Sequence, residues 1–260
     1  YIFNSGGSLA EAYKAAYQTR IPMATIFGAR SSISRSYKLA QLLSHPLIKK
    51  EALDDFSNDK PVMLVWVDEA MNDREEALLH KAEPIWKGEW AALYRLPYSA
   101  FADTVAAAWN SYTEEKGDLA YRNGYAPASA EAVFYDSFDD DNGKAFLGEG
   151  GFYLRRGVAI LADTLLPKGK YEVSLWVCSH HNRAAFPSMR LNRFFPDGTF
   201  ISMMEYDRSG MVDLFRGWLR QSIVFEVEEA QRVQVYFHDR LIIADELMIR
   251  PVETNIYTQP

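Results

Sequence analysis

The sequence contains a single cysteine, Cys178, which excludes a disulfide bond within the chain. It also lacks any apolar run that approaches the roughly 20 residues a helix needs to cross a bilayer. Basic residues are scarce relative to acidic ones, 28 against 35, so the formal net charge is −7. Because a nucleic-acid partner requires a clustered basic surface that neutralises phosphates, this charge argues against nucleic acid and leaves small neutral ligands compatible.

The chain begins at Tyr1 rather than at methionine, and no signal peptide precedes the first predicted element. We therefore expect an excised or processed fragment of a longer protein, whose membrane anchor, where one exists, lies outside it. A length of 260 residues is sufficient for one large domain or two of ordinary size.

The first 125 residues alternate between strand and helix patterns. Residues Pro61–Val67 form a continuous apolar run bounded by charge, which is typical of a strand covered on both faces. An amphipathic helix is predicted over Asp73–Ile85 and a further strand over Ala91–Leu96. This alternation predicts a small, largely parallel α/β domain over residues 1–125. Further predicted elements are helices over Leu9–Gln18 and Phe101–Lys116 and a strand over Ile21–Phe27.

From residue 126 onward the apolar pattern has a period of two, and tight-turn sequences separate the segments. Such a series predicts an antiparallel β-sandwich of the jelly-roll type over residues 126–260. The predicted strands are Ala132–Phe138, Gly151–Leu166, Lys170–Cys178, Ser188–Phe195, Thr199–Tyr206, Trp218–Glu228, Arg232–His238 and Ile242–Arg250.

The strand at Lys170–Cys178 carries a tryptophan on the face where a solvated strand would carry polar residues. Tyr171, Val173 and Val177 share one face, and Trp176 lies on the other. Two interpretations follow. Either this sheet packs against protein on both faces, or Trp176 belongs to an aromatic platform that is presented to a ligand.

Three segments resemble carbohydrate-binding modules of the galactose-binding-like jelly-roll class. Phe134–Asp139, followed by glycines 148, 150 and 151, is similar to the opening of those modules. Gly169–Val177 is similar to their strand G-x-Y-x-x-S-x-W-x, and Ile243–Ile249 resembles their closing strand. The resemblance covers about half of the chain and implies a jelly-roll domain that binds glycans.

The first half resembles the soluble extracytoplasmic tail of bacterial multi-spanning membrane glycosyltransferases. The similar segments are WVDE at residues 66–69, REEALLHKA at residues 74–82 and ALYRLPYSAF at residues 92–101. This resemblance implies an extracytoplasmic location, a membrane-anchored parent protein, and a glycan or lipid-linked sugar as partner. The catalytic residues of such a transferase would lie elsewhere in it.

Sugar C–H faces stack on aromatic rings, and neighbouring amide or charged side chains bind the hydroxyl groups. The candidate ligand-binding residues are Trp176, Trp218, Tyr206, Arg208, Arg216 and Asn192. Each aromatic residue has core packing as its alternative role, because a jelly roll also needs large side chains inside.

An oxygen-rich turn near residue 139 is a candidate calcium site. Asp139 and Asp141 lie in it, and Asp245 of the closing strand could join them, since hard cations prefer oxygen ligands. The resemblance supports a structural calcium ion between these regions, and no other cofactor is expected. The alternative is a solvated acidic turn.

Two further groups are weaker candidates. Cys178, His180, His181 and His238 resemble part of a transition-metal site, with a structural or surface role as the alternative. Asp68 and Glu69 end an apolar strand, a position where α/β proteins place functional carboxylates, but no partner nucleophile can be matched to them. We therefore expect a non-catalytic, extracytoplasmic glycan-binding or accessory fragment. The alternatives are an interaction scaffold of the cell envelope and a carbohydrate-active enzyme that uses Asp68 or Glu69.

Overall fold

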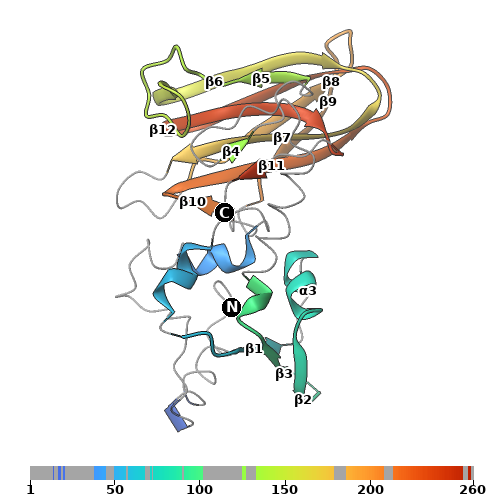
Figure 1. The fold of residues 1–260 in the computed structure, drawn as a ribbon. Helices are drawn as coiled ribbons and strands as arrows, with labels where there is room; N and C mark the ends of the chain where they lie inside the picture. Colours follow the sequence, from blue (N-terminus) through green and yellow to red (C-terminus); the bar gives the residue numbers. More distant parts are fainter. Residues whose placement is uncertain are drawn as a thin grey trace. The chain divides into compact units, whose positions relative to one another are not determined.

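The computed structural model describes residues 14, 17–18, 20, 38–44, 50–56, 58–67, 71, 73–89, 91–101, 125–126, 133–178, 186–207, 213–253 and 257–258. The chain divides into two compact units, drawn in Figure 1. Unit 1 comprises residues 1–111, 212–214 and 260, and unit 2 comprises residues 112–211 and 215–259. Among the helices of the described residues, none combines the length and apolar character that a membrane crossing requires.

Unit 1 contains a three-stranded sheet in the order β1-β3-β2. The strands are β1 (Val62–Val67), β2 (Glu83–Lys87) and β3 (Ala91–Leu96), and β3 pairs antiparallel with both neighbours. The expected largely parallel sheet is therefore not found among these strands. Strands β1 and β2 both pair antiparallel with β3, so they run parallel to each other without being neighbours. Helix α3 (Asp73–Leu79) lies between them in the chain.

Helix α3 is shorter than the sequence predicted, because the predicted Asp73–Ile85 segment divides into a helix and a strand. The helix ends at Leu79, and β2 begins at Glu83. Pro84 explains the division, since proline has no N–H for a helix interior but is tolerated in an edge strand. Strand β2 is such an edge, because it pairs only with β3.

The core of unit 1 lies against one face of this sheet. Leu96, Ala100 and Phe101 form its buried centre. Two short 3-10 helices, η1 (Gln41–Leu43) and η2 (Glu51–Asp55), contribute to the same side. The partly buried side chains packed against this centre are Leu42, Leu53, Val62, Leu64, Leu78 and Ala82.

Unit 2 is built from antiparallel strands and is consistent with a β-sandwich. Its main sheet has the order β10-β11-β7-β12-β8-β9, and β5 and β6 also pair with β12. The strands are β5 (Phe134–Asp136), β6 (Phe152–Leu166), β7 (Gly169–Cys178), β8 (Arg190–Phe194), β9 (Phe200–Glu205), β10 (Leu214–Phe215), β11 (Trp218–Val227) and β12 (Gln231–Pro251). A separate short pair joins β4 (Tyr125–Ala126) and β13 (Tyr257–Thr258).

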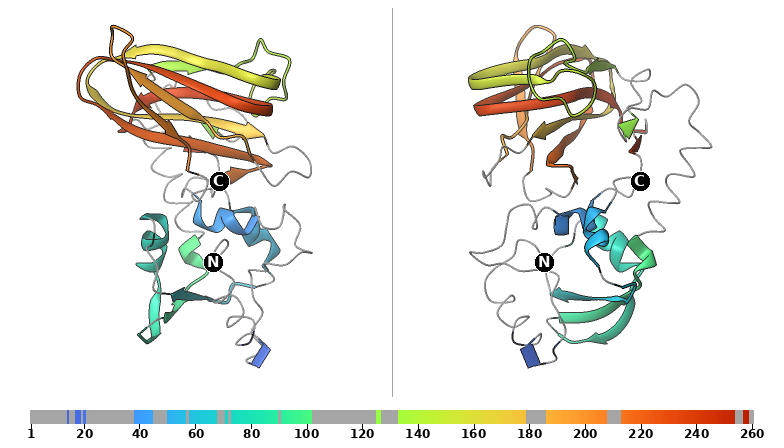
Figure 2. Two further views of the ribbon diagram at one scale, coloured as in Figure 1. Left: turned by 180° about the vertical axis from the view of Figure 1, so that it is seen from behind. Right: turned by 60° about the vertical axis from the view of Figure 1, so that its left-hand side comes forward.

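Strand β12 pairs with four other strands of unit 2, with different partners along its first and last parts. Its first part, residues 231–244, pairs with β6, and residues 232–236 also pair with β8 on the other side. Its last part, residues 244–251, pairs with β7, and residues 247–249 also pair with β5. Figure 1 and both views of Figure 2 draw β6 and β12 side by side along most of their length.

The sequence predicted the antiparallel pairing of this half, but it divided β12 into Arg232–His238 and Ile242–Arg250. The structure instead has one strand of 21 residues. Backbone irregularities replace the expected turn, since Leu241 and Glu246 have φ values of 60° and 55°. Positive φ is uncommon outside glycine, so these positions cannot be found from the alternation of side chains.

A buried amide side chain joins a loop to the sheet in unit 2. Gln221 of β11 is 1% exposed. Its Oε1 accepts the backbone N–H of Met189 at 2.8 Å, and its Nε2 donates to the carbonyl of Pro187 at 2.6 Å. Both backbone groups belong to the buried segment that leads into β8.

We predict that Gln221→Leu destabilises unit 2 by roughly 2–4 kcal/mol, because it leaves a buried N–H and a buried C=O without this partner. Chemical denaturation followed by circular dichroism measures the loss. Val224→Ala on the same strand is the control, since Val224 is 47% exposed, and a surface truncation costs about 0.5 kcal/mol or less. Equal stability of the two variants would contradict the assigned role.

Candidate functional site

The loop between β5 and β6, residues 137–151, is held against β12 by a buried carboxylate. Asp245 is 0% exposed. Its Oδ2 accepts the backbone N–H groups of Phe146 at 2.7 Å and Leu147 at 3.0 Å, and its Oδ1 accepts that of Glu246 at 2.9 Å. Burial raises the pKa of Asp245 to about 7 against these three hydrogen bonds, and the nearby charge of Asp139 adds to the shift.

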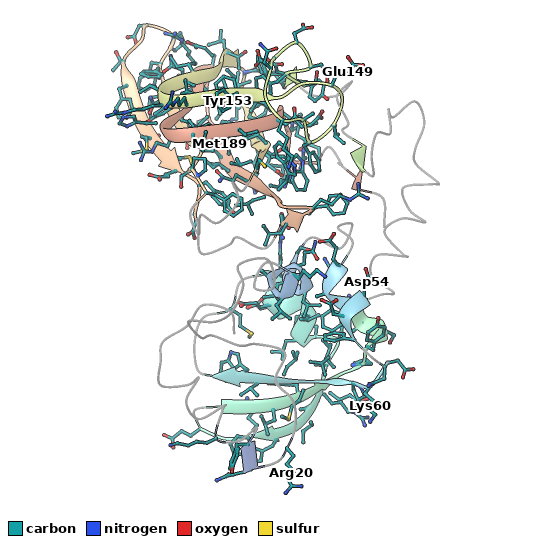
Figure 3. The ribbon with its side chains drawn as sticks, turned by 90° about the vertical axis from the view of Figure 1, so that its left-hand side faces the viewer. Arg20, Asp54, Lys60, Glu149, Tyr153 and Met189 are labelled. Carbon is teal, nitrogen blue, oxygen red and sulfur yellow. The ribbon has the colours of Figure 1, made fainter. Side chains whose placement is uncertain are left out.

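A second carboxylate holds the far side of the same loop, where Figure 3 labels Glu149. Asp139 accepts the N–H of Glu149 at 2.9 Å through Oδ1 and the hydroxyl of Ser137 at 3.0 Å through Oδ2. Gly148 has φ +63°, and a Cβ there would lie 1.8 Å from Asp139 Oδ1. This backbone conformation and the close contact with Asp139 favour glycine at position 148.

The loop covers the tryptophan face of β7 and β11. The ring of Phe146 stacks on Trp176 with centroids 4.3 Å apart, and it lies 5.5 Å from Trp218 and 6.3 Å from Phe215. Trp176 is 1% exposed and Trp218 is 3% exposed. The four rings form one aromatic cluster, which the loop and its two carboxylates fix in place.

The candidate platform residues Trp176, Trp218 and Tyr206 are therefore buried. Of the two interpretations of the tryptophan face, packing on both sides of the sheet agrees with the structure. The cause is Phe146, whose ring occupies the face of Trp176 on which a sugar would stack. Tyr206 is 8% exposed, and its backbone N–H donates to the carbonyl of Met189 at 2.9 Å.

A buried charged group accompanies the cluster on the same face. Glu172 of β7 forms ion pairs with Arg220 of β11 and, at 2.6 Å, with Arg250 of β12. All three side chains are nearly inaccessible. One carboxylate thus joins three strands, and breaking such a buried pair leaves an uncompensated charge.

The predicted metal sites find no support among the described residues, which contain no group of three or more His, Cys, Asp or Glu side chains placed to hold a metal ion. Asp139 and Asp245 lie close enough for the charge of one to affect the other, and both accept hydrogen bonds within the loop. Asp141 is exposed. Cys178 is buried, and Lys144 Nζ donates to its sulfur at 3.8 Å.

The structure describes some of the other candidate residues and not others. Asp68, Glu69, Arg208, His180 and His181 lie outside the described residues. Arg216 is exposed in the turn between β10 and β11, and its guanidinium lies 5.0 Å from the ring of Phe215. Asn192 is partly exposed on β8.

Asn192 belongs to the solvent-exposed side of strands β6, β12, β8 and β9, which we call the outer face. Along β12, Val233, Val235 and Phe237 are 0% exposed, so the alternate residues point outward. The pairing register then places outward residues in three rows across the four strands. The rows are Leu165–Arg232–Phe194–Phe200, Asp163–Gln234–Asn192–Met203 and Ile160–Tyr236–Arg190–Glu205.

Ion pairs, ring contacts and hydrogen bonds fix the side chains of these rows relative to one another. Arg232 forms an ion pair with Asp163 and lies 5.9 Å from the Phe194 ring, which meets Phe200 edge-on at 5.7 Å. Gln234 Nε2 donates to Asp163 Oδ2 at 2.9 Å. These contacts and the Arg232 side-chain hydrogen bond hold the pKa of Asp163 below its usual range, so this carboxylate stays charged.

The outer face combines exposed apolar groups with ordered polar groups. Phe200 is 56% exposed and Met203 is 50% exposed, while Phe194, Tyr236 and Asn192 are partly exposed. Arg190 and Glu205 form a second ion pair at 3.2 Å. Sequence reasoning found Asn192 but missed its neighbours Gln234 and Tyr236, because their proximity depends on the register between β8 and β12. The outward alternation of Arg232, Gln234, Tyr236 and His238 was visible in the sequence.

Comparison with known proteins returned no matching family profile and no matching curated sequence. Solved structures with similarity include carbohydrate-binding modules. A C-terminal family 22 module from Clostridium thermocellum is 15% identical with a TM-score of 0.34, over 50% of this chain and 98% of that one. A tandem family 22 domain from Paenibacillus barcinonensis is 14% identical with a TM-score of 0.33, over 54% and 48%.

A family 35 module from Cellvibrio japonicus is 13% identical with a TM-score of 0.29, over 51% of this chain and 94% of that one. The structural neighbours named here are therefore glycan-binding modules.

We predict that Phe146→Ala uncovers the tryptophan face and lowers the free energy of unfolding by about 3 kcal/mol. The emission maximum of tryptophan fluorescence should shift to longer wavelength, because Trp176 loses the ring that covers it. Phe200→Ala is the matched control, since Phe200 contacts Phe194 and lies on the outer face. An unchanged emission spectrum for Phe146→Ala would show that other groups cover Trp176.

The pKa of Asp245 predicts how stability depends on pH. Its folded-state pKa of about 7 lies above the ordinary value of 3.8, so its contribution to stability is full below about 3.8 and is lost as pH rises through about 7. Measured against Asp245→Asn, the wild-type chain should gain stability between pH 8 and pH 4, by about 4 kcal/mol at most. Denaturation at several pH values tests this, and a difference that grows with rising pH would refute it.

Proposed function

We propose that unit 2 binds glycans at the outer face. The observation that carries the proposal is the arrangement of partly exposed rings, Phe194, Phe200 and Tyr236, around the amides of Asn192 and Gln234. Rings of this kind stack on the C–H faces of sugars, and amides both donate to and accept from hydroxyl groups. The resemblance of three sequence segments to carbohydrate-binding modules supports the same function independently.

The ion pairs of the outer face support binding by ordering the polar groups in advance. Asp163 is held by Arg232 and Gln234, and Arg190 is held by Glu205. Side chains that are already fixed lose less conformational entropy when a ligand binds. A guanidinium or carboxylate in such a pair retains further donor or acceptor positions for hydroxyl groups.

The finer proposal concerns the parent protein. We infer an extracytoplasmic accessory part of a membrane-anchored glycosyltransferase that handles a glycan or a lipid-linked sugar, on the strength of the sequence segments at residues 66–69, 74–82 and 92–101. Protease accessibility of the full-length parent protein in spheroplasts with an intact cytoplasmic membrane tests the location. Protection of this segment from added protease, with cleavage after lysis, would exclude an extracytoplasmic site.

A protein partner at the same face is the second candidate. Val158, Ile160 and Leu165 of β6 are 61%, 56% and 57% exposed, and adjoining exposed apolar residues are typical of interaction surfaces. The two functions differ in the residues that would supply the free energy of binding. A protein partner would depend on these aliphatic side chains, whereas a glycan would depend on Tyr236 and the amides.

We predict that Tyr236→Ala and the double variant Asn192→Ala, Gln234→Ala each weaken glycan binding by about tenfold or more, which corresponds to about 1.4 kcal/mol. A glycan array identifies the ligand, and isothermal titration calorimetry measures the affinities. Val224→Ala on β11 is the control with unchanged affinity, and circular dichroism verifies folding. An array without a hit, or unchanged affinity in both Tyr236→Ala and the double variant, would contradict the proposal.

A further inference from the structure

The rings of the outer face are arranged in two rows with a polar row between them. Phe194 pairs in register with Arg232, and Tyr236 lies four residues further along β12. Because a strand rises about 3.3 Å per residue, the two ring rows are roughly 13 Å apart along the strand direction. A single sugar ring is too small to contact both rows at once.

The middle row supplies the polar contacts between the two ring rows. Gln234 and Asn192 are direct register partners there, with Asp163 beyond Gln234 on β6. A chain that lies along β12 and β8 would stack on Phe194 at one end and on Tyr236 at the other. Its central sugar would then meet the two amides.

The charges of the three rows cancel. Arg232 is paired with Asp163, and Arg190 is paired with Glu205, so the rows hold two cations and two anions. An anionic sugar would have to compete with Asp163 or Glu205 for these guanidinium groups, and an uncharged sugar would not. The rows therefore give no net attraction for a charged ligand.

The outer face is also open beyond both ring rows. Val158, the register partner of His238, follows the Tyr236 row and is 61% exposed. The turn at Gly198 follows the Phe194 row, and a Cβ on that glycine would meet nothing within 4 Å. A ligand chain could thus continue past each end, and a free chain end is not required for binding.

We infer that the outer face takes an internal stretch of an uncharged, linear glycan of about three sugar units or more, because that length spans the two ring rows. This inference rests on the proposed glycan-binding function and specifies its ligand by length and charge. It differs from terminal-sugar recognition, in which a single ring fills the site.

Calorimetry with oligosaccharides of graded length tests the inference on the intact chain. The probes are cello-, xylo-, manno- and laminari-oligosaccharides of one to six units, with oligogalacturonides of the same lengths as the charged series. We expect no measurable binding of monosaccharides and a rise of about tenfold or more between two and four units. Affinity should change less than about twofold between 50 mM and 500 mM sodium chloride, because no net charge is involved.

Phe194→Ala and Tyr236→Ala should each abolish the gain with length, so that the variants bind the hexamer about as the wild type binds the dimer. Tyr236→Phe retains the ring and should retain the length dependence, which guards against loss of fold in the alanine variants. Affinity that is independent of length, or preference for the oligogalacturonides, overturns the inference and leaves glycan binding intact. Binding to none of the probes overturns both.

Discussion

The fold of unit 2 depends on the backbone hydrogen bonding of β12. This strand pairs with β6 and β8 through its first part and with β7 and β5 through its last part. The pairing of β12 with β7 is irregular between Asp245 and Met248, where β12 carries one residue more than β7, and such a bulge bends the strand that carries it. Bulges of this kind re-aim side chains.

That change of direction separates two faces with different roles. Before it, Arg232, Gln234 and Tyr236 point to solvent and form part of the outer face. At the bulge, Asp245 and Glu246 are buried, and Asp245 accepts N–H groups of the β5–β6 loop. One strand therefore supplies both the side chains of the candidate ligand surface and the anchor of the aromatic cluster.

Much of unit 2 could be predicted from the sequence because turn residues separate segments whose apolar pattern has a period close to two. The ends of β6 and β7 agree with the prediction within a residue, since Pro167, Lys168 and Gly169 mark the turn between them. The continuity of β12 could not be predicted, because Asp239 and Arg240 form a polar interruption that is typical of a turn. In unit 1, Pro84 was a visible indication that the helix ends earlier.

The candidate site was harder to predict because it depends on pairings between distant segments. Trp176 lies on the face of its strand where a polar residue would be expected. That face is covered by Phe146, from a loop about 30 residues earlier in the chain, and no local sequence pattern reveals the contact. Asn192 was found by residue type alone. Its partners became identifiable only once β8 and β12 were aligned, since a shift of one residue would turn every side chain to the opposite face.

The buried sulfur of Cys178 has a practical consequence for spectroscopy. Burial raises the pKa of its thiol against the opposing effect of Lys144, so little thiolate forms near neutral pH and the residue reacts slowly with thiol reagents. A cysteine introduced at an exposed position of the outer face would consequently take up a maleimide dye first. Because Cys178 is the single native cysteine, site-specific fluorescent labelling of this chain requires no background substitution.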